Sequence, residues 1–159
     1  MEPPSSNSIA ILNQSGRRIR QEDLREVIAK TLELHGASEF SLEVVLADDD
    51  FVQDLNARFR GKNEQTDVLT FPAPKTPLNH LGEVVISVPY GERQAAHRGV
   101  SGDTELAYLA VHGVLHLLGF EDETEEGHRR MLEEMNRAGT SAGLPPDPEW
   151  CSLLHGGAA

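Results

Sequence analysis

The sequence has a single cysteine, Cys151, which excludes an internal disulfide. It also has no apolar run approaching the roughly 18 residues that a membrane-spanning helix needs. Residues 1–7 lack the basic and apolar regions of a secretion signal. Together these absences predict a cytoplasmic protein without a membrane partner.

Basic residues are also scarce, because 14 Lys and Arg stand against 26 Asp and Glu, which gives a formal net charge of −12. This charge argues against a protein that coats nucleic acid non-specifically. The few basic residues are grouped, however, in residues 17–20, 58–62 and 93–98. A local basic groove is therefore still compatible with the sequence.

The length of 159 residues predicts one domain, and no internal repeat is present. Residues 1–7 are rich in Pro and Ser, and we expect them to be disordered. The folded domain is expected over residues 8–137. Because Gly, Pro and Ser are frequent beyond Gly139, residues 138–159 are predicted to form a loose tail, with Trp150 at the surface.

Hydrophobic periodicity predicts an alternation of strands and helices. Strands are expected over residues 8–13 and 41–47, in a short segment ending at Pro72, and over residues 81–88. Helices are expected over residues 21–34, 51–59 and 90–98, from Ser101 or Asp103 to Leu118, and over residues 123–137. This order predicts an α+β domain with one four-stranded mixed sheet backed by helices.

The helix that ends at Leu118 is apolar almost all round, so it is predicted to be central and buried. By contrast, Asp48–Asp50 precede a helix and are interpreted as an N-cap and a negative first turn, although three consecutive carboxylates also resemble a metal site.

Two histidines interrupt the most apolar helix. His112 and His116 are four residues apart, so both imidazoles lie on one helix face. Gly119 offers a left-handed helix stop, after which the chain can turn back and bring Glu121 or Asp122 towards an ion held by the histidines. Two imidazoles and one carboxylate leave a coordination position for water, as in catalytic metal sites.

Alternatives exist for each candidate residue. The histidines could be satisfied core residues, and Gly113 stands where a zinc peptidase has its general-base glutamate, which disfavours peptide hydrolysis. Arg60 lies in a loop beside Gly61, an arrangement suited to bidentate contact with a phosphate. It could equally be a solvated side chain or the partner of a carboxylate. Thr66–Asp67 is interpreted as the lead-in to a strand.

Three segments together resemble the YbeY family of bacterial metal-dependent endoribonucleases, also called rRNA maturation factors. They are Arg-Gly-Lys with Thr-Asp-Val-Leu-Thr-Phe-Pro in residues 60–72, residues 81–87, and His-Gly-Val-Leu-His-Leu-Leu-Gly-Phe in residues 112–120. The similarity covers roughly residues 8–137. It implies a metallohydrolase that cleaves single-stranded RNA, matures the 3′ end of small-subunit (16S) rRNA and takes part in ribosome quality control.

The resemblance also implies one divalent metal ion, with zinc as the expected ion. The first two of the family's three motif histidines correspond to His112 and His116, and its functional arginine corresponds to Arg60. Asp122 takes the place of the third histidine. We therefore expect His112, His116 and Asp122 to bind the metal. Alternatives are His128 as the third donor, or loss of the third ligand with weak metal binding.

The expected partners are single-stranded rRNA, the small ribosomal subunit and its assembly proteins, but not DNA. In the expected reaction, Arg60 neutralises charge that develops on the phosphoryl oxygens. Two other functions remain. One is a ribosome-associated binding factor whose metal site is structural or vestigial, and the other is a metal-dependent hydrolase of small molecules or peptides.

Overall fold

The computed structural model describes residues 9–75 and 79–151. Its strands form one sheet in the order β1-β2-β4-β3. The strands are β1 (Ile9–Asn13), β2 (Ser41–Ala47), β3 (Val68–Pro72) and β4 (His80–Ser87). Strand β2 pairs in parallel with both β1 and β4, whereas β3 runs antiparallel to β4. The four-stranded mixed sheet predicted from the sequence is confirmed.

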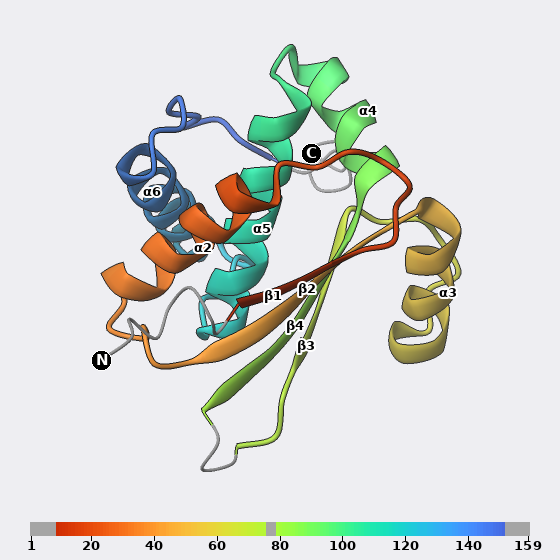
Figure 1. Ribbon diagram of the computed structural model, residues 1–159, viewed down its shortest axis with the longest axis horizontal. Coiled ribbons are helices and arrows are strands. Elements are labelled where there is room, and N and C mark those ends of the chain that lie inside the picture. Colours follow the sequence, from red (N-terminus) through yellow and green to blue (C-terminus); the bar gives the residue numbers. More distant parts are fainter. Residues whose placement is uncertain (1–8, 76–78, 152–159) are drawn as a thin grey trace.

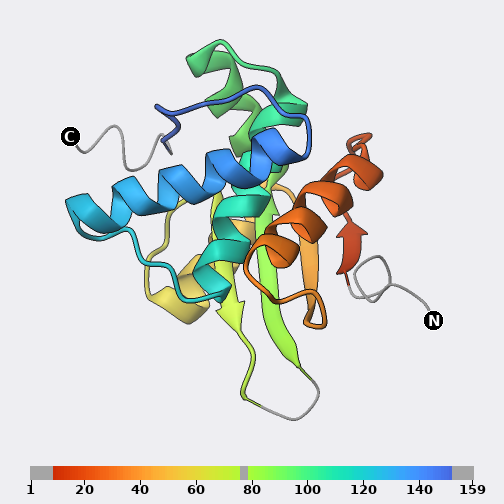
Figure 2. The same cartoon turned by 90° about the vertical axis from the view of Figure 1, so that its left-hand side faces the viewer.

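Five helices are present among the described residues (Figure 1). They are α2 (Gln21–Leu34), α3 (Asp49–Arg60), α4 (Val88–Arg98), α5 (Gly102–Leu117) and α6 (Glu125–Ser141). Helices α2 and α5 pack on one face of the sheet, and α6 lies against both of them on the side away from the sheet (Figure 2). Helix α3 lies on the opposite side and contacts β3 and β4. The predicted α+β class is confirmed.

Helix α5 forms the centre of the core, as predicted. Ser101 caps it by accepting a hydrogen bond from the Thr104 N–H at 3.1 Å. All residues from Glu105 to Leu115 are buried. The helix approaches strand β4 closely because Gly113 has no side chain to separate it from the sheet. This approach places the histidine face of α5 beside the sheet.

The three consecutive aspartates form the N-cap and the first two residues of α3. Asp48 is the N-cap and accepts a hydrogen bond from the Phe51 N–H at 2.9 Å. Asp49 accepts hydrogen bonds from Arg93 and Ser87. Burial alone raises the pKa of Asp49, but these bonds outweigh burial and hold the pKa below its usual value. The interpretation of this segment as a cap and first turn is therefore confirmed for Asp48.

The sequence-based prediction is wrong at the C-terminal end of the described chain. Helix α6 continues to Ser141, and Trp150 is only 2% exposed, where a loose tail was expected from residue 138. Gly139 lies inside this helix and does not end it. It allows α6 to pack closely against Tyr108, because a Cβ atom there would lie 2.7 Å from the Tyr108 hydroxyl oxygen. The expected disordered residues 1–7, and residues 152–159 of the expected tail, lie outside the described residues.

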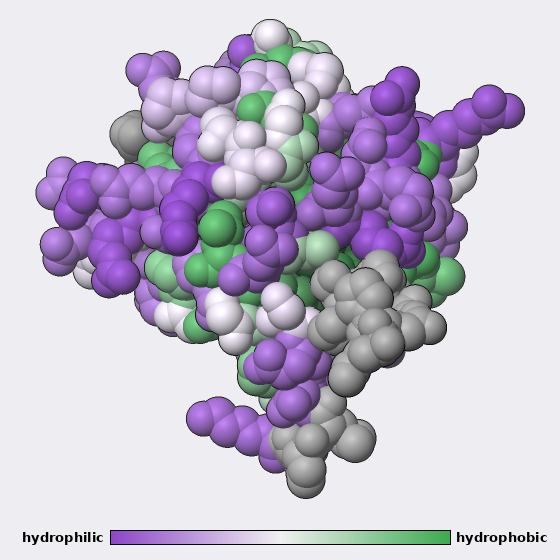
Figure 3. Space-filling model, turned by 60° about the vertical axis from the view of Figure 1, so that its left-hand side comes forward, coloured by the Kyte–Doolittle hydropathy of each residue, from purple (hydrophilic) through white to green (hydrophobic). Residues whose placement is uncertain are grey.

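On the face that carries α2 and α6, hydrophilic residues predominate and apolar residues are visible in small areas between them (Figure 3). Within the described part of the chain, none of the helices combines the length and apolar character needed to span a membrane.

Candidate metal centre

The chain reverses direction directly after helix α5. Gly119 has a positive φ of 104°, a conformation that carries little steric cost without a Cβ atom. The Phe120 N–H donates to the Leu115 carbonyl oxygen at 3.0 Å, which closes the turn. The following residues therefore run back beside the end of α5, and this return brings Asp122 to the two histidines.

His112, His116 and Asp122 form a cluster with the spacing of a metal site. The Nε2 atoms of the two histidines are 3.1 Å apart. Oδ2 of Asp122 lies 3.7 Å from Nε2 of His112, and Oδ1 lies 3.7 Å from Nε2 of His116. A tetrahedral zinc ion with bonds of about 2.0–2.2 Å separates its ligand atoms by roughly 3.3–3.6 Å. Taking one ligand atom from each residue, the three atoms lie within 4.8 Å of one another, so small side-chain rotations would bring them around one such ion.

Hydrogen bonding fixes the orientation of His116. Its Nδ1 lies 2.9 Å from the Phe120 carbonyl oxygen, which can only accept, so in the neutral ring Nδ1 carries the proton. Nε2 of His116 then presents a lone pair towards Nε2 of His112. A proton or a cation must lie between two such nitrogens at 3.1 Å. The Asp122 carboxylate raises the pKa of His116, although burial opposes this effect.

The structure distinguishes among the acids and histidines near the cluster. His112 is 4% exposed, and Asp122 is partly buried. Glu121 approaches Nδ1 of His116 at 3.9 Å, but its side chain is 73% exposed. Among the residues that the structure describes, the cluster with ligand spacing contains Asp122 and does not contain His128, which is exposed on α6.

Arg60 lines the same cleft as this cluster. The cleft has a volume of about 620 Å³. Arg60 is the last residue of α3, and its Nη2 donates to the Thr70 carbonyl oxygen at 2.8 Å. Because a guanidinium has five N–H donors, this bond orients the side chain and leaves donors for a phosphate. The fold thus brings together residues that are far apart in the sequence.

Three polar residues line the cleft wall without having been predicted there. Thr66 and Asp67 directly precede β3, as predicted, but they are also only 6% and 4% exposed and line the cleft. Asn56 is buried one helix turn before Arg60 and donates to the Glu64 carbonyl oxygen at 2.9 Å. Its i, i+4 relation to Arg60 was a usable signal, whereas the burial of Thr66 and Asp67 depends on tertiary packing.

The cleft is acidic despite Arg60. Its lining includes two basic residues, Arg60 and Lys62, and five acidic ones, Glu64, Asp67, Glu121, Asp122 and Glu123. Most of the other grouped arginines are paired with carboxylates: Arg17 with Glu92, Arg20 with Asp103, Arg58 with Asp54, Arg93 with Asp49, and Arg98 with Asp147. These pairs disfavour a broad basic groove. The excess of acidic residues in the cleft favours binding of a cation over binding of a free phosphate.

Comparisons with known proteins identify the family of the chain. The family model described as Endoribonuclease YbeY matches residues 10–142. Proteins named endoribonuclease YbeY from Persephonella marina and Shouchella clausii are 35% and 37% identical over 131 and 152 residues. The alignments cover 79% and 84% of this chain and 86% and 94% of theirs.

A solved structure shares the fold. The solution structure of TM1509 from Thermotoga maritima matches with a TM-score of 0.59 and 26% identity, covering 84% of this chain and 90% of that chain. With the family model spanning most of the sequence, the chain belongs to the endoribonuclease YbeY family.

Proposed function

We propose that this protein is a metal-dependent endoribonuclease that cleaves single-stranded RNA. The observation that carries the proposal is that the exposed Arg60 guanidinium and the His112, His116 and Asp122 cluster line one cleft. Membership of the endoribonuclease YbeY family supports RNA as the substrate. The catalytic role of Arg60 and the ligand roles of the cluster are part of this proposal.

In this proposal the residues of the cluster bind the metal ion, and Arg60 stabilises charge on the substrate. His112, His116 and Asp122 would hold one divalent ion, for which zinc suits the nitrogen and oxygen donors. When bound, the ion supplies Lewis-acid polarisation of a phosphoryl oxygen and activation of water. Arg60, held by Thr70, donates to phosphoryl oxygens as charge develops on them.

The depth of the cluster favours a single strand. Because His112 is only 4% exposed, a scissile phosphate has to enter the cleft. A single strand can splay its bases and bend its backbone into such a site, whereas a duplex holds its phosphates on a stiff helix. We include in the proposal maturation of the 3′ end of small-subunit rRNA and ribosome quality control. Contact with the small subunit and its assembly proteins in the cytoplasm belongs to it as well.

The test is cleavage of a labelled single-stranded RNA by the purified protein, before and after chelation and with zinc added back. We expect chelation to stop cleavage and zinc to restore it, while a duplex of the same sequence stays intact. His116→Ala should abolish cleavage. His97→Ala, which changes an exposed histidine on α4, should leave it unchanged.

Two further variants discriminate the third ligand. Asp122→Ala should reduce the bound zinc, and His128→Ala should not. Chelator-insensitive cleavage, or cleavage retained by His116→Ala, would contradict the proposal. If the wild type does not cleave but Arg60→Ala impairs binding to the small subunit, the protein is instead a ribosome-associated factor.

A further inference from the structure

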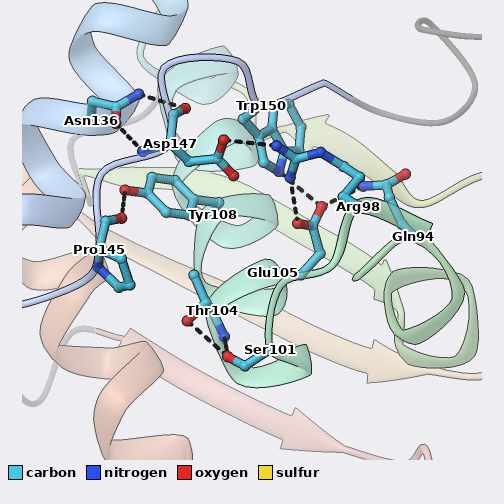
Figure 4. A network of polar contacts seen from close by, with 10 residues as sticks. All are labelled: Gln94, Arg98, Ser101, Thr104, Glu105, Tyr108, Asn136, Pro145, Asp147 and Trp150. Atoms are coloured by element: carbon cyan, nitrogen blue, oxygen red, sulfur yellow. Dashed lines mark hydrogen bonds and ion pairs between the residues drawn. The ribbon is translucent and has the colours of Figure 1, made fainter. Parts of the chain in front are cut away.

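A polar network between helices α4 and α5 holds Trp150, the only tryptophan of the sequence, in place (Figure 4). The Trp150 indole N–H donates to Oε2 of Glu105 at 2.8 Å. Gln94 donates to the same oxygen at 2.6 Å, and Arg98 donates to Oε1 at 3.1 Å. The Glu105 side chain is 0% exposed, so its carboxylate is surrounded by donors inside the core.

The segment that carries Trp150 is attached at three further points. Arg98 donates to Asp147 at 2.7 Å. Asn136 of α6 accepts from the Asp147 N–H at 2.6 Å and donates to its carbonyl oxygen at 3.0 Å. The Tyr108 hydroxyl donates to the Pro145 carbonyl oxygen at 2.7 Å. The chain from Pro145 to Trp150 is thus attached to helices α4, α5 and α6.

The other side of the indole faces the candidate metal centre. The ring centroids of Trp150 and His112 are 5.1 Å apart, with an interplanar angle of 40°. Glu105 and His112 are seven residues apart on α5, which places them two turns apart on one face. The indole therefore spans the distance between the buried carboxylate and the imidazole.

The composition of the network points to positioning rather than to stability alone. Burial raises the pKa of Glu105 although Gln94, Trp150 and Arg98 act against this rise. A buried charge network often adds little stability compared with apolar packing of the same volume. What the network does determine is the location of the indole, and the indole packs against the imidazole of His112.

We propose that Trp150 is a positioning residue that fixes the His112 imidazole for metal binding, and that Glu105, Arg98 and Asp147 hold Trp150 in place. The inference rests on the metal site of the proposed function and adds to it a residue that orients one of the proposed ligands. Groups that orient a ligand from outside the first coordination sphere change metal affinity by about 10–100-fold. The effect requires no contact between Trp150 and RNA.

The test is titration of the metal-free protein with Co²⁺, followed by its visible absorption band. Trp150→Ala should weaken Co²⁺ affinity by about 10-fold or more and should change the band shape, because the His112 ring reorients. Trp150→Phe keeps an aromatic ring against His112 but loses the N–H that Glu105 holds, so its Co²⁺ affinity should lie between those of the wild type and Trp150→Ala. In the wild type, bound Co²⁺ should also quench Trp150 fluorescence with the same midpoint.

Two other variants separate positioning from folding. Ile28→Ala removes side-chain volume from the core on α2, outside the polar network that holds Trp150, and should lower the melting temperature without changing Co²⁺ affinity. Asp147→Asn weakens the attachment of Arg98 without a core cavity and should reduce Co²⁺ affinity moderately. If Trp150→Ala does not fold, the Co²⁺ affinity of Asp147→Asn tests the inference instead.

The outcomes are distinguishable. If the wild type binds Co²⁺ and the folded Trp150 and Asp147 variants bind it equally well, the inference is overturned and the proposed nuclease function is not affected. The inference is also overturned if Ile28→Ala weakens Co²⁺ binding as much as Trp150→Ala does. If the wild type itself does not bind Co²⁺, the proposed metal site fails and the inference fails with it.

Discussion

Gly113 of helix α5 lies directly over Val84 of strand β4, where a Cβ atom on the glycine would come within 2.6 Å of Cγ1 of Val84. We therefore predict that Gly113→Ala destabilises the protein by up to about 2 kcal/mol, because an overpacking cost of about 1–3 kcal/mol outweighs the gain of about 1 kcal/mol in helix propensity. Urea denaturation measures the difference. Adding Val84→Ala should recover part of the loss, as a double-mutant cycle would show.

Gly102→Ala is the matched control. Gly102 is the first residue of the same helix, and no atom lies within 4 Å of the Cβ position. The substitution should therefore leave stability nearly unchanged. Equal losses in both variants would show that close approach to the sheet is not the cause.

We predict that Asp122→Asn lowers the pKa of His116 in the metal-free protein, since the Asp122 carboxylate raises it. A histidine with a raised folded-state pKa stabilises the fold fully below its unfolded value of about 6.5. That contribution is lost as the pH rises through the folded-state pKa. The stability difference between wild type and Asp122→Asn should thus be larger at about pH 5.5 than at about pH 8.5.

Histidine NMR titration measures the pKa, and denaturation at the two pH values measures the stability difference. His128→Ala provides a control, because His128 is exposed and lies outside the cluster. An unchanged His116 pKa in Asp122→Asn would show that the two side chains do not interact in solution.

Arg60→Ala should reduce kcat for RNA cleavage by about 100- to 1,000-fold, the usual effect of losing one transition-state donor. Metal content should not change, because Arg60 is not in the ligand cluster. Arg60→Lys should restore little of the rate, since an ammonium lacks the planar fork. Arg58→Ala, which removes an exposed arginine paired with Asp54, should cleave at the wild-type rate.

Binding of single-stranded RNA should depend weakly on salt. If Arg60 and Lys62 each neutralise one phosphate, log K should fall with log salt at a slope of about −1.4. Arg60→Ala should make the slope less steep by about 0.7. Fluorescence anisotropy with a non-cleavable RNA measures both values, and a slope several times steeper would indicate a binding surface outside the cleft.

Metal removal should weaken RNA binding itself, not only cleavage. Without a cation, the five acidic side chains of the cleft face the phosphate with only two basic ones. Anisotropy measurements before and after chelation test this at constant ionic strength. Equal affinity in the two states would show that the phosphate does not enter the cleft.

Local patterns predicted the α+β class and the proximity of His112, His116 and Asp122, because hydrophobic periodicity and a short turn both act over short stretches of chain. The i, i+4 histidines and the Gly119 turn are close in the sequence, and the structure places Asp122 beside them. By contrast, the segment after residue 138 was predicted wrongly. A composition rich in Gly and Pro does not reveal that Gly139 packs against Tyr108 or that the Trp150 indole N–H donates to the buried Glu105 carboxylate.

The cleft wall was also beyond local reasoning. Thr66 and Asp67 are buried by tertiary packing, in which the Ser87 N–H donates to the Asp67 carbonyl oxygen, and the sequence of the loop does not reveal that contact. Arg60 was identified through its motif, but its contact with Thr70 depends on the position of β3.

The candidate ligands and the arginine depend on the fold to different extents. His112, His116 and Asp122 belong to one helix and the turn after it, so their association closes a short stretch of chain at small entropic cost. Arg60 reaches them only after α3 has docked on the sheet and β3 has paired with β4. The arrangement that the proposed reaction needs, with Arg60 beside the cluster, therefore exists only in the completed fold.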